Sequence, residues 1–207
     1  MSNLVEVIRT LIEESVNINL KTELICALDV NEDLLKKFKI KHECNYADIK
    51  TLYGIQLKEY CIINICSFLD EYDNFFSKNY IEPLYTDRII KVKQFLRPFI
   101  KEIKKDYHLK DYRNHILAHN LRANSKSLLM GKIVKTYNFP KYTEEFNSIN
   151  TIIIMILRII VKEFKNDLPI DYWQDKVINS KKIVMDRKAK VFDLQKLSRS
   201  AESILSK

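Results

Sequence analysis

The chain has 207 residues, of which 46% are apolar and 30% charged, a balance typical of globular rather than disordered proteins. Only two glycines occur, which weighs against α/β nucleotide-binding folds and all-β folds, because their tight turns need glycine. Lysine and arginine exceed the acids by 35 − 27 = 8, and this charge of +8 favours RNA, DNA or anionic lipid as partners, although a solvated basic surface explains it as well.

Cysteine spacing and hydropathy bear on location. The four cysteines contain no CxxC pair, so we expect core thiols in a reducing compartment. The first ten residues include Glu6 and Arg9 and do not resemble a signal peptide. The most apolar run, Ile152–Val161, is about half as long as a membrane span and contains Arg158. We therefore expect a cytoplasmic protein without a membrane segment, in which this run forms a buried core helix.

Helical periodicity covers most of the chain. Apolar residues at helical spacing predict helices over residues 3–15, 20–28, 34–38, about 49–76, 86–103, 109–119 and about 143–164. Ile55, Ile62, Cys66, Leu69 and Phe76 form the predicted apolar stripe of the fourth of these. Thr86 or Asp87 is a candidate cap for the next helix, and Pro98 predicts a bend or interruption in it.

Two segments depart from this pattern. Residues 128–139 are ambiguous between a short strand pair and an extended connector. From residue 171 the periodicity weakens and lysines dominate. We therefore predict an all-α helical domain over residues 1–170, and a basic C-terminal helical extension or tail over 171–207.

The segment from Asp111 to Asn120 concentrates the residues suited to catalysis. Arg113 and His119 lie six positions apart, about 120° around a helix and roughly 9 Å along it, so a long arginine side chain can converge with the histidine on one phosphate. Arginine can hold a phosphodiester bidentately, and histidine titrates near neutrality. Because RNA carries its own nucleophile, the 2′-hydroxyl, a metal-free ribonuclease needs little beyond these two functions.

The string Arg-Asn-His-Ile-Leu-Ala-His from Arg113 to His119 resembles the signature of the HEPN superfamily, especially its abortive-infection and toxin members. The resemblance implies a helical bundle with additional N- and C-terminal helices, which dimerises and cleaves RNA without metal or cofactor, leaving a 2′,3′-cyclic phosphate. It assigns phosphate binding to Arg113, proton transfer to His119, and the polar position after the arginine to Asn114.

The resemblance also implies partners, namely RNA, a second copy of the chain and an antitoxin protein in a defence or toxin–antitoxin system. The tyrosine that often follows the histidine of such toxins by two positions is replaced by Leu121, which puts neutralisation by tyrosine modification at that position in doubt. The alternative function is a non-catalytic helical module that binds RNA, a nucleotide or a partner protein.

Other residues are possible supports for this site. His115 is a packed neighbour of the catalytic pair or, as an HxxxH pair with His119 and a further ligand such as His42 or Asp73, a zinc ligand. Tyr112 lies on the same helix, and Asp73 can pair with Arg113, orient His119 or be an exposed helix-end acid. The candidate RNA-binding residues are Arg122, Lys126, Lys181, Lys182 and Arg187.

Overall fold

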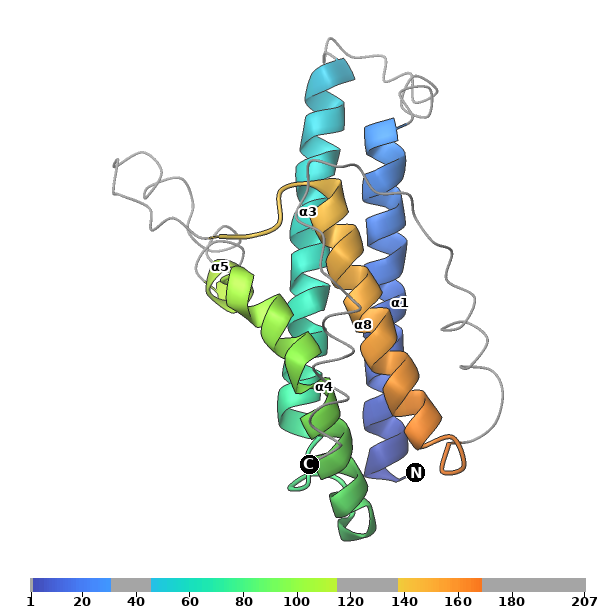
Figure 1. Ribbon diagram of the computed structural model, residues 1–207. Coiled ribbons are helices and arrows are strands. Elements are labelled where there is room, and N and C mark those ends of the chain that lie inside the picture. Colours follow the sequence, from blue (N-terminus) through green and yellow to red (C-terminus); the bar gives the residue numbers. More distant parts are fainter. Residues whose placement is uncertain (1, 31–45, 115–137, 169–207) are drawn as a thin grey trace.

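The computed structural model describes residues 2–30, 46–114 and 138–168 of the chain. Within these ranges the main elements are four long helices, α1 (Asn3–Val30), α3 (Tyr46–Asp70), α4 (Thr86–Asp106) and α8 (Thr143–Glu163). Figure 1 shows α1, α3 and α8 running alongside one another, with α1 antiparallel to the other two, while α4 packs against α8. No strand occurs in these ranges, and the predicted all-α class is confirmed.

The N-terminal region is one helix, so the prediction of two helices over 3–15 and 20–28 was wrong. The buried positions of α1 recur every three or four residues: Leu4, Val7, Ile8, Leu11, Ile12, Ser15, Ile18, Thr22, Ile25 and Leu28. Two members of this stripe, Ser15 and Thr22, are polar, which hides its continuity in the sequence. The Thr22 hydroxyl donates to the Ile18 carbonyl at 2.8 Å, so its burial leaves no donor unsatisfied.

The predicted long helix over 49–76 is α3 followed by a π-helical turn, η1 (Glu71–Phe75), in which the Phe76 N–H donates to the Glu71 carbonyl at 3.0 Å. Four of the five residues of the predicted stripe are buried, but Ile55 is 50% exposed. The extra residue of a π-turn rotates the following side chains around the helix axis, and such turns are frequent at functional sites.

The helix α4 follows a short 3-10 turn, η2 (Pro83–Tyr85), and no side chain caps it, so the predicted cap at Thr86 or Asp87 was wrong. Pro98 lies inside α4, which continues as one helix to Asp106. Near its start, Arg88 joins α4 to the end of α8 through ion pairs with Glu163 and Asp167.

The apolar run predicted to be a buried core helix lies in α8, and that prediction is confirmed. Ile152, Ile153, Ile156, Leu157 and Ile160 are completely buried, while Arg158 is on the exposed face. Polar burial occurs in the first half of α8, where the Asn150 side-chain amide donates to Asn19 Oδ1 at 2.8 Å and so ties α8 to α1.

Among the helices that can be described, none is both long enough and apolar enough to cross a lipid bilayer.

Candidate phosphate-binding site

The predicted motif begins in α5 (Leu109–Tyr112), a short helix that follows α4 and packs against α3. Leu109 and Tyr112 are buried, and the Tyr112 ring stacks on Phe139 with centroids 4.3 Å apart and planes at 23°. Two hydrogen bonds also join His108 to Asn138. The backbone N–H of His108 donates to the Asn138 carbonyl at 2.8 Å, and the backbone N–H of Asn138 donates to the side-chain Nδ1 of His108 at 3.3 Å. These contacts fix the backbone that carries the next residue, Arg113.

Arg113 is held at the boundary between core and solvent, with 27% of its side chain exposed. Its Nη1 donates to Asp70 Oδ2 at 2.7 Å, and its Nε donates to Asn114 Oδ1 at 3.1 Å. The remaining nitrogen, Nη2, makes no hydrogen bond to any residue that the structure describes. Together these two hydrogen bonds fix the orientation of the guanidinium plane and its distance from the core.

Arg113 is the end of a chain of alternating charges. The other oxygen of the Asp70 carboxylate, Oδ1, forms a second ion pair, with Lys110 Nζ at 2.6 Å. Lys110 Nζ also lies 3.4 Å from Asp73 Oδ2, and Lys104 Nζ contacts the same carboxylate at 2.7 and 2.8 Å. Three cations and two carboxylates from α4, α5, α3 and η1 thus form one continuous network.

Asp70 and Lys110, which form the shortest ion pair of the network, are both ionised at neutral pH. Partial burial opposes ionisation of Asp70, but hydrogen bonds and charge from Lys110 and Arg113 lower its pKa below the ordinary value. Partial burial likewise disfavours charged Lys110, but the hydrogen bond and charge of Asp70, with the charge of Asp73, raise its pKa. Asp70 and Lys110 therefore remain a charged pair under physiological conditions.

Cys66 lies one helical turn before Asp70 on α3 and is completely buried. Burial raises the pKa of the Cys66 thiol to about 11, although the charge of Arg113 acts in the opposite direction. The thiol is therefore protonated at neutral pH and is a poor nucleophile. It packs beneath the network, and the chemistry of the site falls to the charged groups.

The structure describes four of the predicted site residues: Tyr112, Arg113, Asn114 and Asp73. Arg113 and Asn114 are hydrogen-bonded to each other, and Tyr112 anchors their helix in the core. Asp73 pairs with Lys104 and Lys110, while its neighbour Asp70 pairs with Arg113. The other predicted residues lie outside the described residues: His115, His119, Arg122, Lys126, Lys181, Lys182 and Arg187.

The histidines of the alternative zinc site, His42, His115 and His119, also lie outside the described residues. Among the residues that the structure does describe, no three histidine, cysteine or acidic side chains gather as metal ligands would.

Sequence reasoning missed three members of the network: Asp70, Lys104 and Lys110. One sequence feature points to Lys110, because it precedes Arg113 by three positions and so shares its helix face. Asp70 carries no comparable feature. Its position opposite Arg113 depends on the packing of α5 against α3, which links residues 43 positions apart.

Comparison with known proteins adds no relative, because no protein-family model, no curated protein and no solved structure matches this chain.

Proposed function

We propose that the protein is a metal-independent endoribonuclease of the HEPN type, acting as a homodimer in a defence or toxin–antitoxin system. The observation that supports it best is the placement of Arg113. Its guanidinium is part-exposed, oriented by Asp70 and Asn114, and adjacent to a second cation, Lys110. A preoriented arginine beside a lysine suits recognition of a phosphodiester, which carries one negative charge spread over two free oxygens.

The proposed reaction uses the nucleophile that RNA already contains. The 2′-hydroxyl oxygen attacks phosphorus while a base, assigned by the resemblance to His119, takes its proton. The bond from phosphorus to the 5′-oxygen breaks, the leaving oxygen is protonated, and a 2′,3′-cyclic phosphate remains. Arg113 Nη2 is the donor that we assign to the phosphate oxygens, on which negative charge increases in the transition state.

We expect a dimer because a single copy of the motif supplies few catalytic side chains. One arginine and one histidine make a small active site, and the resemblance implies that two copies of the motif share one cleft. Light scattering at tens of micromolar should therefore report twice the mass of the 207-residue chain. A species that is active on RNA and strictly monomeric would contradict this part of the proposal.

A second candidate function is a module that binds RNA without cutting it. The pairing of Arg113 Nη1 with Asp70 at 2.7 Å favours it, because a carboxylate on the guanidinium offsets the positive charge that a phosphate on Nη2 would meet. Such an offset tunes affinity in a binding protein, whereas it reduces the charge stabilisation that catalysis needs.

Cleavage assays on matched variants separate the two functions. In EDTA, Arg113→Ala is expected to cut RNA about 10²–10³ times more slowly, the usual cost of losing a charge-stabilising donor. His119→Ala is expected to lose about 10²–10⁴, the usual contribution of acid–base catalysis. His115→Ala is the control, since it is the same residue type four positions away in the sequence, and it should retain more activity than His119→Ala.

Three results would change this assignment. Greater loss in His115→Ala than in His119→Ala would move the proton-transfer role. Loss of activity in EDTA would favour the zinc pair. RNA binding without cleavage by the purified wild-type protein would favour the binding module.

A further inference from the structure

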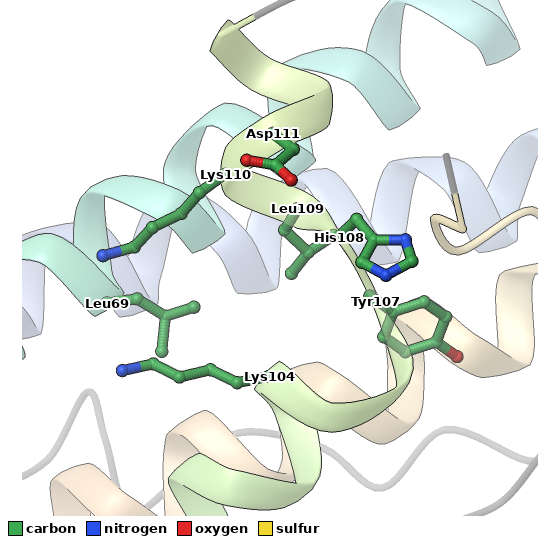
Figure 2. Close-up of a pocket in the computed structure, with 7 residues that line it drawn as sticks. All are labelled: Leu69, Lys104, Tyr107, His108, Leu109, Lys110 and Asp111. Carbon is green, nitrogen blue, oxygen red and sulfur yellow. The ribbon is translucent and has the colours of Figure 1, made fainter. Parts of the chain in front are cut away.

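A pocket of about 310 Å³ lies where the end of α4 and the start of α5 meet α3. Figure 2 shows the ammonium groups of Lys104 and Lys110 on one side of it and the rings of Tyr107 and His108 on the other. Leu69 lies between the two lysines in this view. The pocket thus offers the exposed ring of His108 and two cations, over the buried side chains of Leu69 and Tyr107.

The two lysines converge on a single anionic group. Lys104 Nζ lies 2.7 Å and Lys110 Nζ 3.4 Å from the same oxygen, Asp73 Oδ2. Asp73 is on the π-helical turn η1, next to the pocket rather than among the residues that line it. Its carboxylate shows that both ammonium groups reach one anion at the same time, which is the arrangement that a phosphate needs for two-point binding.

The opposite side of the pocket offers a defined hydrogen-bond donor. His108 Nδ1 accepts the Asn138 N–H at 3.3 Å, so the proton of the neutral imidazole is on Nε2. The neighbouring Tyr107 is fixed in turn, because its hydroxyl donates to Glu145 Oε1 at 3.0 Å. Tyr107 is buried, so a base in the pocket would meet the exposed ring of His108 and its one N–H donor. The carboxylate of Asp111 also borders the pocket.

Shared carboxylates connect the two lysines of the pocket to Arg113. Asp70 joins Arg113 to Lys110, and Asp73 joins Lys110 to Lys104. A nucleic-acid strand whose phosphate lies on Arg113 would therefore bring its adjoining nucleotide to this pocket.

We infer that this pocket binds the nucleotide next to the scissile phosphate of single-stranded RNA, with Lys104 and Lys110 as ligands of the adjoining phosphate. The inference rests on the proposed function, and it places the RNA path along α4 and α5. Single-stranded substrates suit such a site, since their unpaired bases are free to stack in a pocket.

The test measures binding separately from cleavage. Fluorescence anisotropy of a short oligonucleotide with 2′-O-methyl riboses, which cannot be cut by the proposed reaction, gives the affinity of the full chain over a series of salt concentrations. Lys104→Gln and Lys110→Gln should each weaken binding and lower the slope of log affinity against log salt by about 0.7, the value for one lost phosphate contact on a single strand. The matched controls are Lys91→Gln and Lys162→Gln, because these lysines line a separate pocket between α4 and α8.

Asp73→Asn supplies a readout that a purely structural role would not produce. Removing this carboxylate frees Lys104 and leaves Lys110 with Asp70 as its one carboxylate in the network, so the affinity for phosphate should rise, while the thermal stability falls as it does in Lys104→Gln. Opposite changes in affinity with parallel changes in stability support binding by the lysines if the rise in affinity exceeds that of Glu102→Gln, which changes the net charge equally.

Each outcome decides the inference. Equal affinities for wild type, Lys104→Gln and Lys110→Gln would overturn the pocket while leaving RNA cleavage at Arg113 in place. No binding of the oligonucleotide to the wild type would overturn both proposals. Weakened binding in the two lysine variants, together with a wild type that cuts no RNA, would support the pocket and reject the cleavage reaction.

Discussion

Replacing Asp70 by asparagine removes a carboxylate that two cations share, at nearly the same side-chain volume. The lost contacts are the 2.7 Å pair with Arg113 and the 2.6 Å pair with Lys110. Asp70 is 30% exposed, so solvent screens part of each attraction, and about 1–2 kcal/mol is a reasonable total for two such pairs. In a chain of this length that loss corresponds to a decrease in Tm of about 2–8 °C.

The pH dependence identifies the origin of the effect. The pKa of Asp70 is lowered in the folded protein, so its stabilisation is complete above the unfolded value of about 3.9 and disappears as the pH falls through the lower folded value. Urea unfolding of wild type and Asp70→Asn should therefore differ at pH 7 and converge only as the pH falls through the lowered folded pKa of Asp70. Glu102→Gln on α4 is the control and should match the wild type at pH 7 and at low pH. The reasoning would be refuted if Asp70→Asn were as stable as wild type at pH 7. It would also be refuted if the difference in stability between the two proteins were as large at low pH as at pH 7.

Other substitutions test the frame that holds the site. Gly54→Ala should raise the free energy of unfolding by about 0.5–1 kcal/mol, because Gly54 is inside α3 and an added Cβ meets nothing within 4 Å. Arg88→Ala should lower it by about 1–3 kcal/mol, since the guanidinium pairs with two acids and lies 4.5 Å from the centroid of the Phe164 ring. Glu82→Gln should be slightly less stable than wild type at pH 7 and equal to it in acid, because the carboxylate accepts the first backbone N–H groups of α1. Chemical denaturation measures all three.

The fold class was predictable because the apolar pattern of the long helices is regular. In the second half of α8, from Ile152 to Val161, the buried face consists of isoleucine, leucine and valine at helical spacing. In α1 the same regularity is present, but Ser15 and Thr22 occupy two of the buried positions. Small hydroxyl side chains fit a helix interface when they bond to the preceding turn, and a hydropathy pattern cannot distinguish them from loop residues.

The candidate site was predictable only in its local part. Arg113 and Asn114 follow from a short motif, and their mutual hydrogen bond joins neighbours in the chain. The other contacts of the network come from the tertiary structure, since Asp70, which holds the arginine, belongs to another helix, and Asp73, which holds the two lysines, belongs to a π-helical turn. A π-turn depends on how a helix fits its neighbours more than on residue type, so neither acid was predicted in its observed pairing.

The measurement that tests the central claim most directly is the cleavage of a defined RNA by the wild-type protein in EDTA, with Arg113→Ala prepared in the same way. The RNA is compared with a copy in which a single 2′-hydroxyl, next to the main cleavage position, is replaced by hydrogen. We expect the wild type to cut the normal RNA and leave a 2′,3′-cyclic phosphate, the copy to resist at that position, and Arg113→Ala to be slower by a factor of about 100 or more. Equal cleavage by Arg113→Ala, or undiminished cleavage of the copy at the substituted position, would contradict the account.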